Sequence, residues 1–177
     1  MRIVPPHRKT FEFEQQLTGP ADEVFALMCP VRECEWVEGW RPRLVVSSSG
    51  LAEPGCVFVT SDRVTSSGEQ RDAVWLIVRH QPAQRRTEMI KMTPGHLVTR
   101  LWIAVQPGTA GSSSARIRYE FTALGPEGSA FVDEYSDESW KAFMTTWERA
   151  LNAFLDGRHA TRENRSASND FDAAGLS

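Results

Sequence analysis

Residues 140–155 read WKAFMTTWERALNAFL, and their apolar side chains recur at intervals of three and four, the spacing of one face of an α-helix. We expect the longest helix of the chain here, within residues 127–156, and we expect Gly157 to end it. The acidic run 133–138 lies toward its N-terminal end, where the helix dipole favours negative charge. Such a helix needs an apolar surface against which to bury its stripe. The stripe consists of Trp140, Phe143, Met144, Trp147, Leu151, Phe154 and Leu155.

Strands predicted from the rest of the chain provide that surface. Residues 10–17 alternate between apolar and polar side chains, as do residues 116–121, which is typical of half-buried strands. After Pro42, turn residues such as Pro54-Gly55 and Pro94-Gly95 separate further strand-like runs. Short connections between neighbours predict an antiparallel meander. The predicted strands are residues 10–17, 43–48, 56–62, 73–81, 86–93, 97–106 and 115–123.

Two short helices are expected between the first two strands. The first follows Pro20, which suits an opening helical turn, and the second covers Pro30–Trp40, between Pro30 and Gly39. The chain therefore runs strand, two short helices, six strands and a long helix. This order predicts an α+β fold in which a curved antiparallel seven-stranded sheet wraps around the C-terminal helix. A cavity often remains between such a sheet and its helix.

Three local motifs add to this order. Residues 27–40, LMCPVRECEWVEGW, contain the spacing P-x-x-E-x-x-W-x-x-G-W and lead into residues 44–58. Pro94-Gly95-His96 opens a late strand, and residues 125–131, GPEGSAF, precede the closing helix with its segment 147–155. In these features the chain resembles a bacterial subgroup of the START-related helix-grip superfamily, also called SRPBCC, which includes polyketide cyclase/dehydrase-like and lipid-transfer proteins.

The resemblance covers residues 8–157 and implies one helix-grip (START-like) domain over that range. It further implies a hydrophobic cavity under the last helix, entered past the short helices and loops. It carries over no catalytic residues, because the superfamily shares no single catalytic set.

Aromatic side chains and one methionine are the expected ligand contacts. Trp36 and Trp40 lie four residues apart and share a helix face, where they either border the cavity or anchor the short helices on the sheet. Tyr119 points inward by strand parity, whereas the pattern leaves the faces of Trp75 and Trp102 open. The candidate ligand-binding residues are Trp36, Trp40, Trp75, Trp102, Tyr119, Tyr135, Met144 and Trp147.

Glu33, His80 and Glu88 are the candidates for acid/base catalysis, and Arg79 is a further ionisable residue on a predicted strand. A carboxyl or imidazole group beside a dry pocket can shift its pKa toward a catalytically useful value. Pairing with an arginine or capping a loop is the structural alternative for Glu33. The sequence contains no HExxH, CxxC, GxSxG, P-loop or GxGxxG motif. We therefore expect neither a metal nor a cofactor.

Composition sets the remaining expectations. The 177 residues are 41% hydrophobic and 24% charged with a net charge of -3, typical of a soluble globular domain and unfavourable for binding nucleic acid or anionic membranes. The chain has no apolar run of membrane-spanning length, no signal-peptide pattern and an odd number of cysteines, three, which predicts a cytoplasmic protein without membrane insertion. The polar residues 158–177 predict a disordered tail. We expect a monomer or a homodimer.

These features predict binding of a small hydrophobic or aromatic molecule, lipid-like or polyketide-like, in a cavity between the sheet and the C-terminal helix. A polyketide cyclase or dehydratase-like enzyme using acid/base catalysis is the first alternative, so whether the chain is an enzyme stays open. The second alternative is a protein-interaction module without a ligand. That alternative predicts a filled cavity and an exposed apolar patch.

Overall fold

The computed structural model describes residues 3–63 and 68–173, and the side chains of residues 3–62 and 68–160. Its strands are β1 (Arg8–Leu17), β2 (Leu44–Val46), β3 (Val57–Arg63), β4 (Gln70–Gln81), β5 (Arg86–Thr93), β6 (Leu97–Pro107) and β7 (Ser113–Ala123). Its α-helices are α1 (Ala21–Leu27), α2 (Pro126–Glu134) and α3 (Asp137–Ala173), and its short 3₁₀ turns are η1 (Glu33–Glu35) and η2 (Pro82–Gln84).

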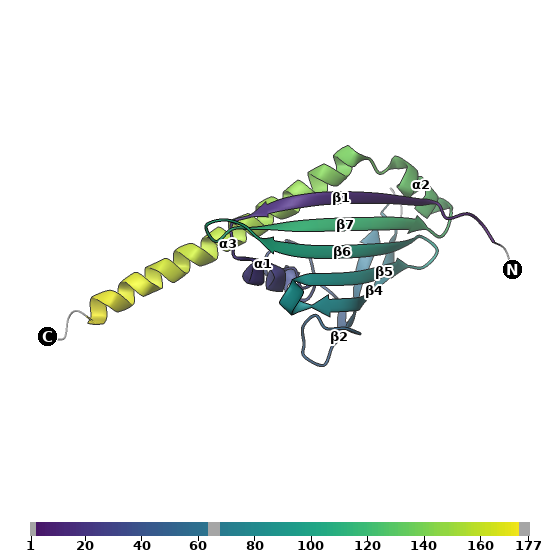
Figure 1. The fold of residues 1–177 in the computed structure, drawn as a ribbon. Helices are drawn as coiled ribbons and strands as arrows, with labels where there is room; N and C mark the ends of the chain where they lie inside the picture. The colour runs from purple at the N-terminus through teal and green to yellow at the C-terminus, as the bar shows by residue number, and fades with distance from the viewer. Residues whose placement is uncertain (1–2, 64–67, 174–177) are drawn as a thin grey trace.

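The strands form one seven-stranded antiparallel sheet in the order β1-β7-β6-β5-β4-β3-β2. Strands β2 to β7 follow one another as a meander, and β1 extends the sheet by pairing with β7. Figure 1 shows α3 passing behind these strands and crossing the sheet beside β1. The predicted α+β helix-grip fold is therefore confirmed.

Apolar and polar side chains together fix α3 against the first strand. Trp140 and Leu155 of its stripe are buried in the core. The Trp140 indole donates a hydrogen bond from Nε1 to the carbonyl oxygen of Glu12 at 3.1 Å, and the amide oxygen of Asn152 accepts one from the backbone N–H of Thr18 at 3.0 Å. These contacts lie at the two ends of the stripe, so they hold the helix along the inner face of the sheet.

The single helix predicted within residues 127–156 is in fact two helices. Tyr135, between α2 and α3, has an extended backbone, and the Ser136 hydroxyl then accepts a hydrogen bond from the backbone N–H of Ser139 at 3.1 Å, which caps the start of α3. At its other end α3 continues through Gly157 to Ala173, so the predicted helix end at Gly157 is wrong. A glycine weakens a helix by about 1 kcal/mol but keeps its backbone hydrogen bonds. Disorder of residues 158–177 stays a prediction.

The predicted second short helix, Pro30–Trp40, is only the turn η1 within a series of turns. Two indoles redirect the segment: Trp36 donates from Nε1 to the carbonyl oxygen of Leu27 at 2.9 Å, and Trp40 donates to that of Pro30 at 2.7 Å. Gly39 has a φ of 77°, in the left-handed region that suits glycine. The segment therefore folds back toward the end of α1 and carries both tryptophans over the sheet.

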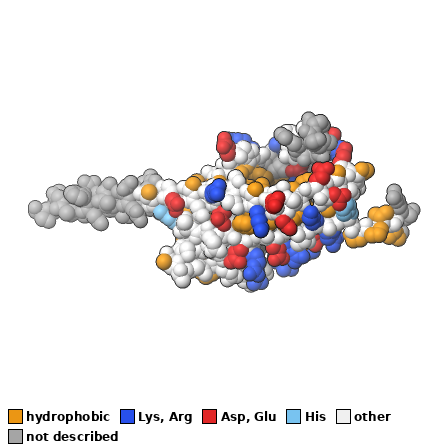
Figure 2. Space-filling view, turned by 90° about the horizontal axis from the view of Figure 1, so that it is seen from above, with side chains coloured by type: hydrophobic (Ala, Val, Ile, Leu, Met, Phe, Trp, Pro, Cys, Tyr) orange, Lys and Arg blue, Asp and Glu red, His pale blue; other side chains and the backbone are white. Residues whose placement is uncertain are grey.

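Charges of both signs share the surface. Figure 2 shows Lys and Arg side chains interspersed with Asp and Glu side chains on the face seen from above. Cross-strand pairs between β7 and β1 contribute to this mixture, with Arg118 at 3.7 Å from Glu12 and Arg116 at 3.9 Å from Glu14. That the chain does not bind nucleic acid stays a prediction. In the described ranges, no helix has the length and apolar character needed to cross a bilayer.

Candidate ligand-binding cavity

A cavity of about 380 Å³ lies between the inner face of the sheet and α3, under the turns of residues 30–40. Strands β3 to β7 provide its floor, α3 provides one wall, and Glu38, Gly39 and Phe143 mark its mouth because they are exposed. The residues that line it are Pro30, Glu33, Val37, Glu38, Gly39, Trp40, Asp62, Trp75, Met89, Lys91, Leu101, Tyr119, Phe143 and Trp147.

Three tryptophans from distant parts of the chain form an aromatic wall around Trp40. The ring centroid of Trp40 lies 5.9 Å from that of Trp75 on β4 and 6.4 Å from that of Trp147 on α3, both edge to face. Such pairs add about 0.5–1.5 kcal/mol beyond the burial of their area. The Trp75 indole donates to the Thr60 hydroxyl at 2.9 Å, so its polar edge is satisfied. The wall is therefore rigid and presents apolar ring surface to the cavity.

Glu33 places a carboxyl group at this aromatic wall. Its side chain is buried, and burial raises its pKa to about 8. In the part of the chain that the structure describes, the carboxyl group has no hydrogen-bond partner. Burial is the main cause that raises the pKa of the neighbouring Tyr119 phenol. The second cause is the negative charge that Glu33 carries at the high pH at which a phenol ionises. At neutral pH the cavity therefore contains a protonated carboxyl group beside a protonated phenol, and both can donate a hydrogen bond.

A second polar group in the cavity is an ion pair. The Lys91 ammonium lies 2.6 Å from the Asp62 carboxylate, with side chains that are 17% and 19% exposed. The same carboxylate accepts a hydrogen bond from the Thr93 hydroxyl at 2.8 Å. Lys91 also lies 5.3 Å from the ring centroid of Trp75, a cation–π contact. The pair thus provides a fixed dipole at the cavity surface.

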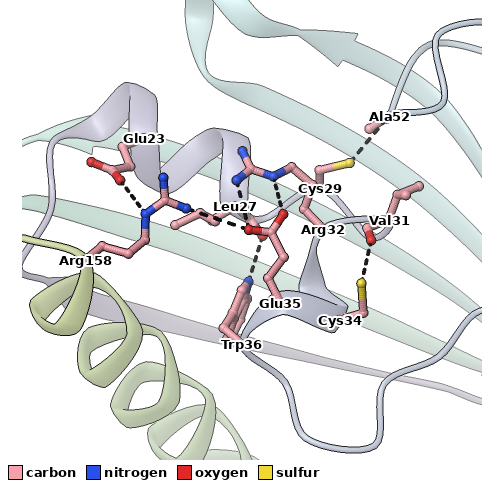
Figure 3. Close-up of polar contacts among 10 residues, drawn as sticks. All are labelled: Glu23, Leu27, Cys29, Val31, Arg32, Cys34, Glu35, Trp36, Ala52 and Arg158. Carbon is pink, nitrogen blue, oxygen red and sulfur yellow. Dashed lines mark hydrogen bonds and ion pairs between the residues drawn. The ribbon is translucent and has the colours of Figure 1, made fainter. Parts of the chain in front are cut away.

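Figure 3 shows polar contacts that hold the turns of residues 30–40, which cover the cavity. The Arg32 guanidinium pairs with the Glu35 carboxylate at 2.7 Å, and Arg158 of α3 lies 3.7 Å from the same carboxylate and 3.4 Å from that of Glu23 on α1. Cys29 adds a contact to the loop after β2, because its sulfur accepts a hydrogen bond from a backbone N–H there at 3.2 Å. The turns of residues 30–40 are thus held between α1 and α3.

Most of the predicted ligand contacts lie in or beside this cavity. Trp36 and Met144 line a small adjoining space of about 20 Å³, which they share with Glu33. Tyr135 lies elsewhere: its ring stacks on Phe131, with centroids 5.0 Å apart, in the core between α2 and the sheet. Trp40, Trp75, Tyr119 and Trp147 line the main cavity.

Trp102 lies on the opposite, outer face of the sheet. The guanidinium groups of Arg100 and Arg118 cover its ring, at 4.5 and 4.9 Å from the centroid. Paired antiparallel residues share a face, and Trp102 pairs with Glu88 and Arg118, whereas Leu101 pairs with Met89 and Tyr119. Trp102 was therefore wrongly predicted to border this cavity.

Of the catalytic candidates, only Glu33 reaches the cavity. Glu88 and Arg79 face the outer side, where Glu88 is buried beneath Arg100 at 2.5 Å. His80 faces inward but lies beyond the cavity, stacked on Phe25 of α1 with centroids 5.2 Å apart, and burial lowers its pKa. A β-bulge between Ile77 and Arg79 shifts the alternation of β4 at this point.

The side chains of β5 that face the cavity were not among the residues predicted from the sequence. Met89 and Lys91 line the cavity, while Ile90 and Met92 face outward. The outward set is at least as apolar as the inward set, so alternation alone does not identify the buried face. In the described ranges no cluster of three His, Cys, Asp or Glu side chains is arranged to hold a metal ion, and the absence of a metal stays a prediction.

No protein-family model matches the chain, and no curated protein matches its sequence. Among solved structures, norcoclaurine synthase from Thalictrum flavum, a point mutant with a transition-state analogue, aligns with a TM-score of 0.62 at 13% identity over 88% of this chain and 99% of that chain. The same enzyme with dopamine and hydroxybenzaldehyde aligns with a TM-score of 0.57 at 12% identity, covering 81% and 86%.

A bacterial protein, CV1439 from Chromobacterium violaceum, aligns with a TM-score of 0.56 at 17% identity, covering 81% of this chain and 95% of that chain. At such identities the likeness shows the fold alone. It confirms the helix-grip fold.

Proposed function

We propose that the protein binds a small hydrophobic or aromatic molecule in the cavity between the sheet and α3. The observation that carries the proposal is a cavity of about 380 Å³ whose wall contains Trp40, Trp75 and Trp147 around one neutral carboxyl group. Small-molecule sites typically have about 300–1,000 Å³, mostly apolar walls and few polar groups. The cavity has each of these properties.

The polar groups indicate what the ligand carries. The protonated Glu33 carboxyl group can donate a hydrogen bond, so it suits a carbonyl or hydroxyl oxygen on the ligand. The flat indole surfaces suit an aromatic or polyketide-like ring system more than a flexible acyl chain, because ring stacking needs a planar partner. The structures of norcoclaurine synthase with dopamine and hydroxybenzaldehyde support this proposal, since they show a fold of this kind with small aromatic molecules.

Truncation of Trp40 tests the placement of the ligand. The probe is naphthol, a flat aromatic molecule with one hydroxyl group, titrated calorimetrically into the protein. We expect Trp40→Ala to raise the dissociation constant at least about 10-fold, because a lost aromatic contact of about 1.4 kcal/mol corresponds to that factor. Trp102→Ala is the matched control, since it removes the same side chain from the outer face, and it should leave the affinity within about 2-fold. Equal affinities for both variants would place the ligand elsewhere.

A second candidate function is acid/base catalysis in the same cavity, and the buried Glu33 beside Tyr119 favours it. A group with a pKa of about 8 both gives and takes protons near neutral pH. The test is incorporation of solvent deuterium next to the carbonyl group of ketones that the protein binds. Catalysis by Glu33 predicts that Glu33→Gln abolishes exchange and retains binding, whereas unchanged exchange would remove Glu33 from the reaction.

A further inference from the structure

The outer face of the sheet carries an apolar surface on the side opposite the cavity. Leu44, Val46, Val74, Leu76 and Met92 are large apolar side chains between 39% and 56% exposed. They come from three different strands, β2, β4 and β5, and partly exposed valines and an isoleucine lie among them. Exposed leucines and valines are normal when scattered singly, whereas a contiguous patch marks an interaction site.

The strand register makes this surface contiguous. One cross-strand row runs Leu44, Val59, Val74, Met92 and Val98, through β2, β3, β4, β5 and β6. The next row runs Val46, Val57, Leu76 and Ile90, through β2 to β5. Directly paired antiparallel residues have Cβ atoms about 4.5–5.5 Å apart, so neighbours within each row touch. We call these two rows the apolar outer face.

Among the residues that the structure describes, the helices contact the other side of the sheet. Phe25 of α1 stacks on His80. Phe131 of α2 meets Phe121 edge to face, and Trp140 of α3 contacts Tyr119 with the two rings tilted. His80, Phe121 and Tyr119 all face inward. The apolar outer face consists entirely of strand residues, from β2 to β6. Two sheets can pack face to face, with their strands within about 30° of alignment.

We infer that the apolar outer face is the contact between two copies of this chain, related by a twofold axis and packed sheet to sheet. A twofold contact uses the same patch on both copies, so one apolar face supplies both halves of the interface. Of the two oligomeric states expected from the sequence, monomer and homodimer, this inference selects the homodimer. It is independent of the proposed ligand, because the cavity lies on the inner side of the sheet.

The area of the face and the charges at its borders support a second copy of the chain as the binding partner. With strands about 4.8 Å apart and same-face residues about 6.8 Å apart, the two rows span roughly 330 Å². The outward-facing residues beside them are mostly polar or charged, among them Asp72, Glu88 and Thr122, and with these as a rim the contact would reach roughly 800 Å². A standard interface buries about 800 Å² per partner, with an apolar centre and a polar rim. Each of the two borders of the face has one positively and one negatively charged side chain. Arg43 pairs with Asp72 on one border, and Arg100 pairs with Glu88 on the other. A twofold axis perpendicular to the strands places each border of one copy opposite the other border of its partner.

The mass of the protein in solution tests the inference. Sedimentation velocity from about 1 to about 200 µM should show a species of twice the chain mass that gains population with concentration. Val74→Lys and Met92→Lys each place a charge at the centre of the face and should raise the dimer dissociation constant at least about 100-fold, because each would bury an unpaired ammonium group among apolar side chains. Leu124→Lys is the matched control, a 48% exposed leucine after β7 that lies outside the face, and it should leave the dimer intact.

Two readouts separate loss of the contact from loss of the fold. Each variant should keep its circular dichroism spectrum and its naphthol affinity, because neither side chain lines the cavity. If a lysine variant does not fold, the wild-type protein still decides the matter, since a dimer unfolds at a temperature that rises with protein concentration. A wild-type monomer at every concentration overturns the inference, and so does a dimer that neither lysine substitution weakens.

Discussion

Replacing Glu33 by glutamine is expected to stabilise the protein by about 3 kcal/mol near pH 7 and by almost nothing near pH 4. Burial holds the pKa of Glu33 at about 8 in the fold, against an ordinary value of 4.5. Between these two values the folded state keeps a proton that the unfolded state has released. The free energy of unfolding therefore falls as the pH rises through this window, and it levels off above about pH 8. Glutamine resembles the neutral carboxyl group in shape and has no such dependence.

Thermal and urea unfolding across this pH range measure the effect. For a chain of this length, about 3 kcal/mol corresponds to a rise in melting temperature of about 6–12 °C. Glu35→Gln is the matched control two residues away. The Glu35 pKa is lowered, chiefly by its hydrogen bond to Arg32, so this substitution should slightly reduce stability at neutral pH instead of raising it. Unfolding free energies of the wild type and Glu33→Gln that run parallel from acidic to basic pH would contradict the burial of a neutral Glu33.

Lys91→Met is expected to destabilise the protein by about 2 kcal/mol. The substitution leaves the Asp62 carboxylate, which is only 19% exposed, with the Thr93 hydroxyl but without its cation. Breaking a fully buried pair costs about 3–5 kcal/mol, and the smaller figure applies here because the cavity admits water to the carboxylate. Methionine matches the aliphatic stem of lysine in length, so the packing of that stem against Trp75 is retained.

A double-mutant cycle isolates the ion pair from other effects of the substitution. Urea unfolding of Lys91→Met, of Asp62→Asn and of the double variant should give a coupling energy of about 1–2 kcal/mol, with the double variant more stable than the two single losses added together. Additive losses would show that the two groups act independently, despite the 2.6 Å between them.

The sequence predicted the elements whose signals are local. The strand β5, Arg86–Thr93, has the predicted bounds, because Pro82 and Pro94-Gly95 punctuate both ends. The inward position of Tyr119 follows from strict alternation in β7, and the apolar stripe of α3 packs as its spacing indicates. Local signals also explain the error at Gly157, since a glycine favours a helix end without enforcing one.

The composition of the site depended on contacts that no local pattern contains. Trp75 and Trp102 both sit in strands with mixed faces, and the register places the first in the cavity and the second between two arginines. The register places Lys91 on the inner face opposite Trp75, where Asp62, distant in the sequence, pairs with it. The turns of residues 30–40 depend on two indole hydrogen bonds to backbone carbonyl groups, which a search for helical periodicity does not detect. Glu33 was a candidate by sequence, but only this tertiary arrangement buries it.

Native mass spectrometry tests most directly whether the cavity holds a small molecule. The protein is sprayed from a volatile buffer before and after incubation with separate pools of flat aromatics, sterols and fatty acids. The proposed function predicts a one-to-one adduct from the aromatic pool that disappears on denaturation, persists in Trp102→Ala and is strongly reduced in Trp40→Ala. A folded protein that gains no mass from any pool, or gains it equally in Trp40→Ala, would contradict the assignment of this cavity as the ligand-binding site.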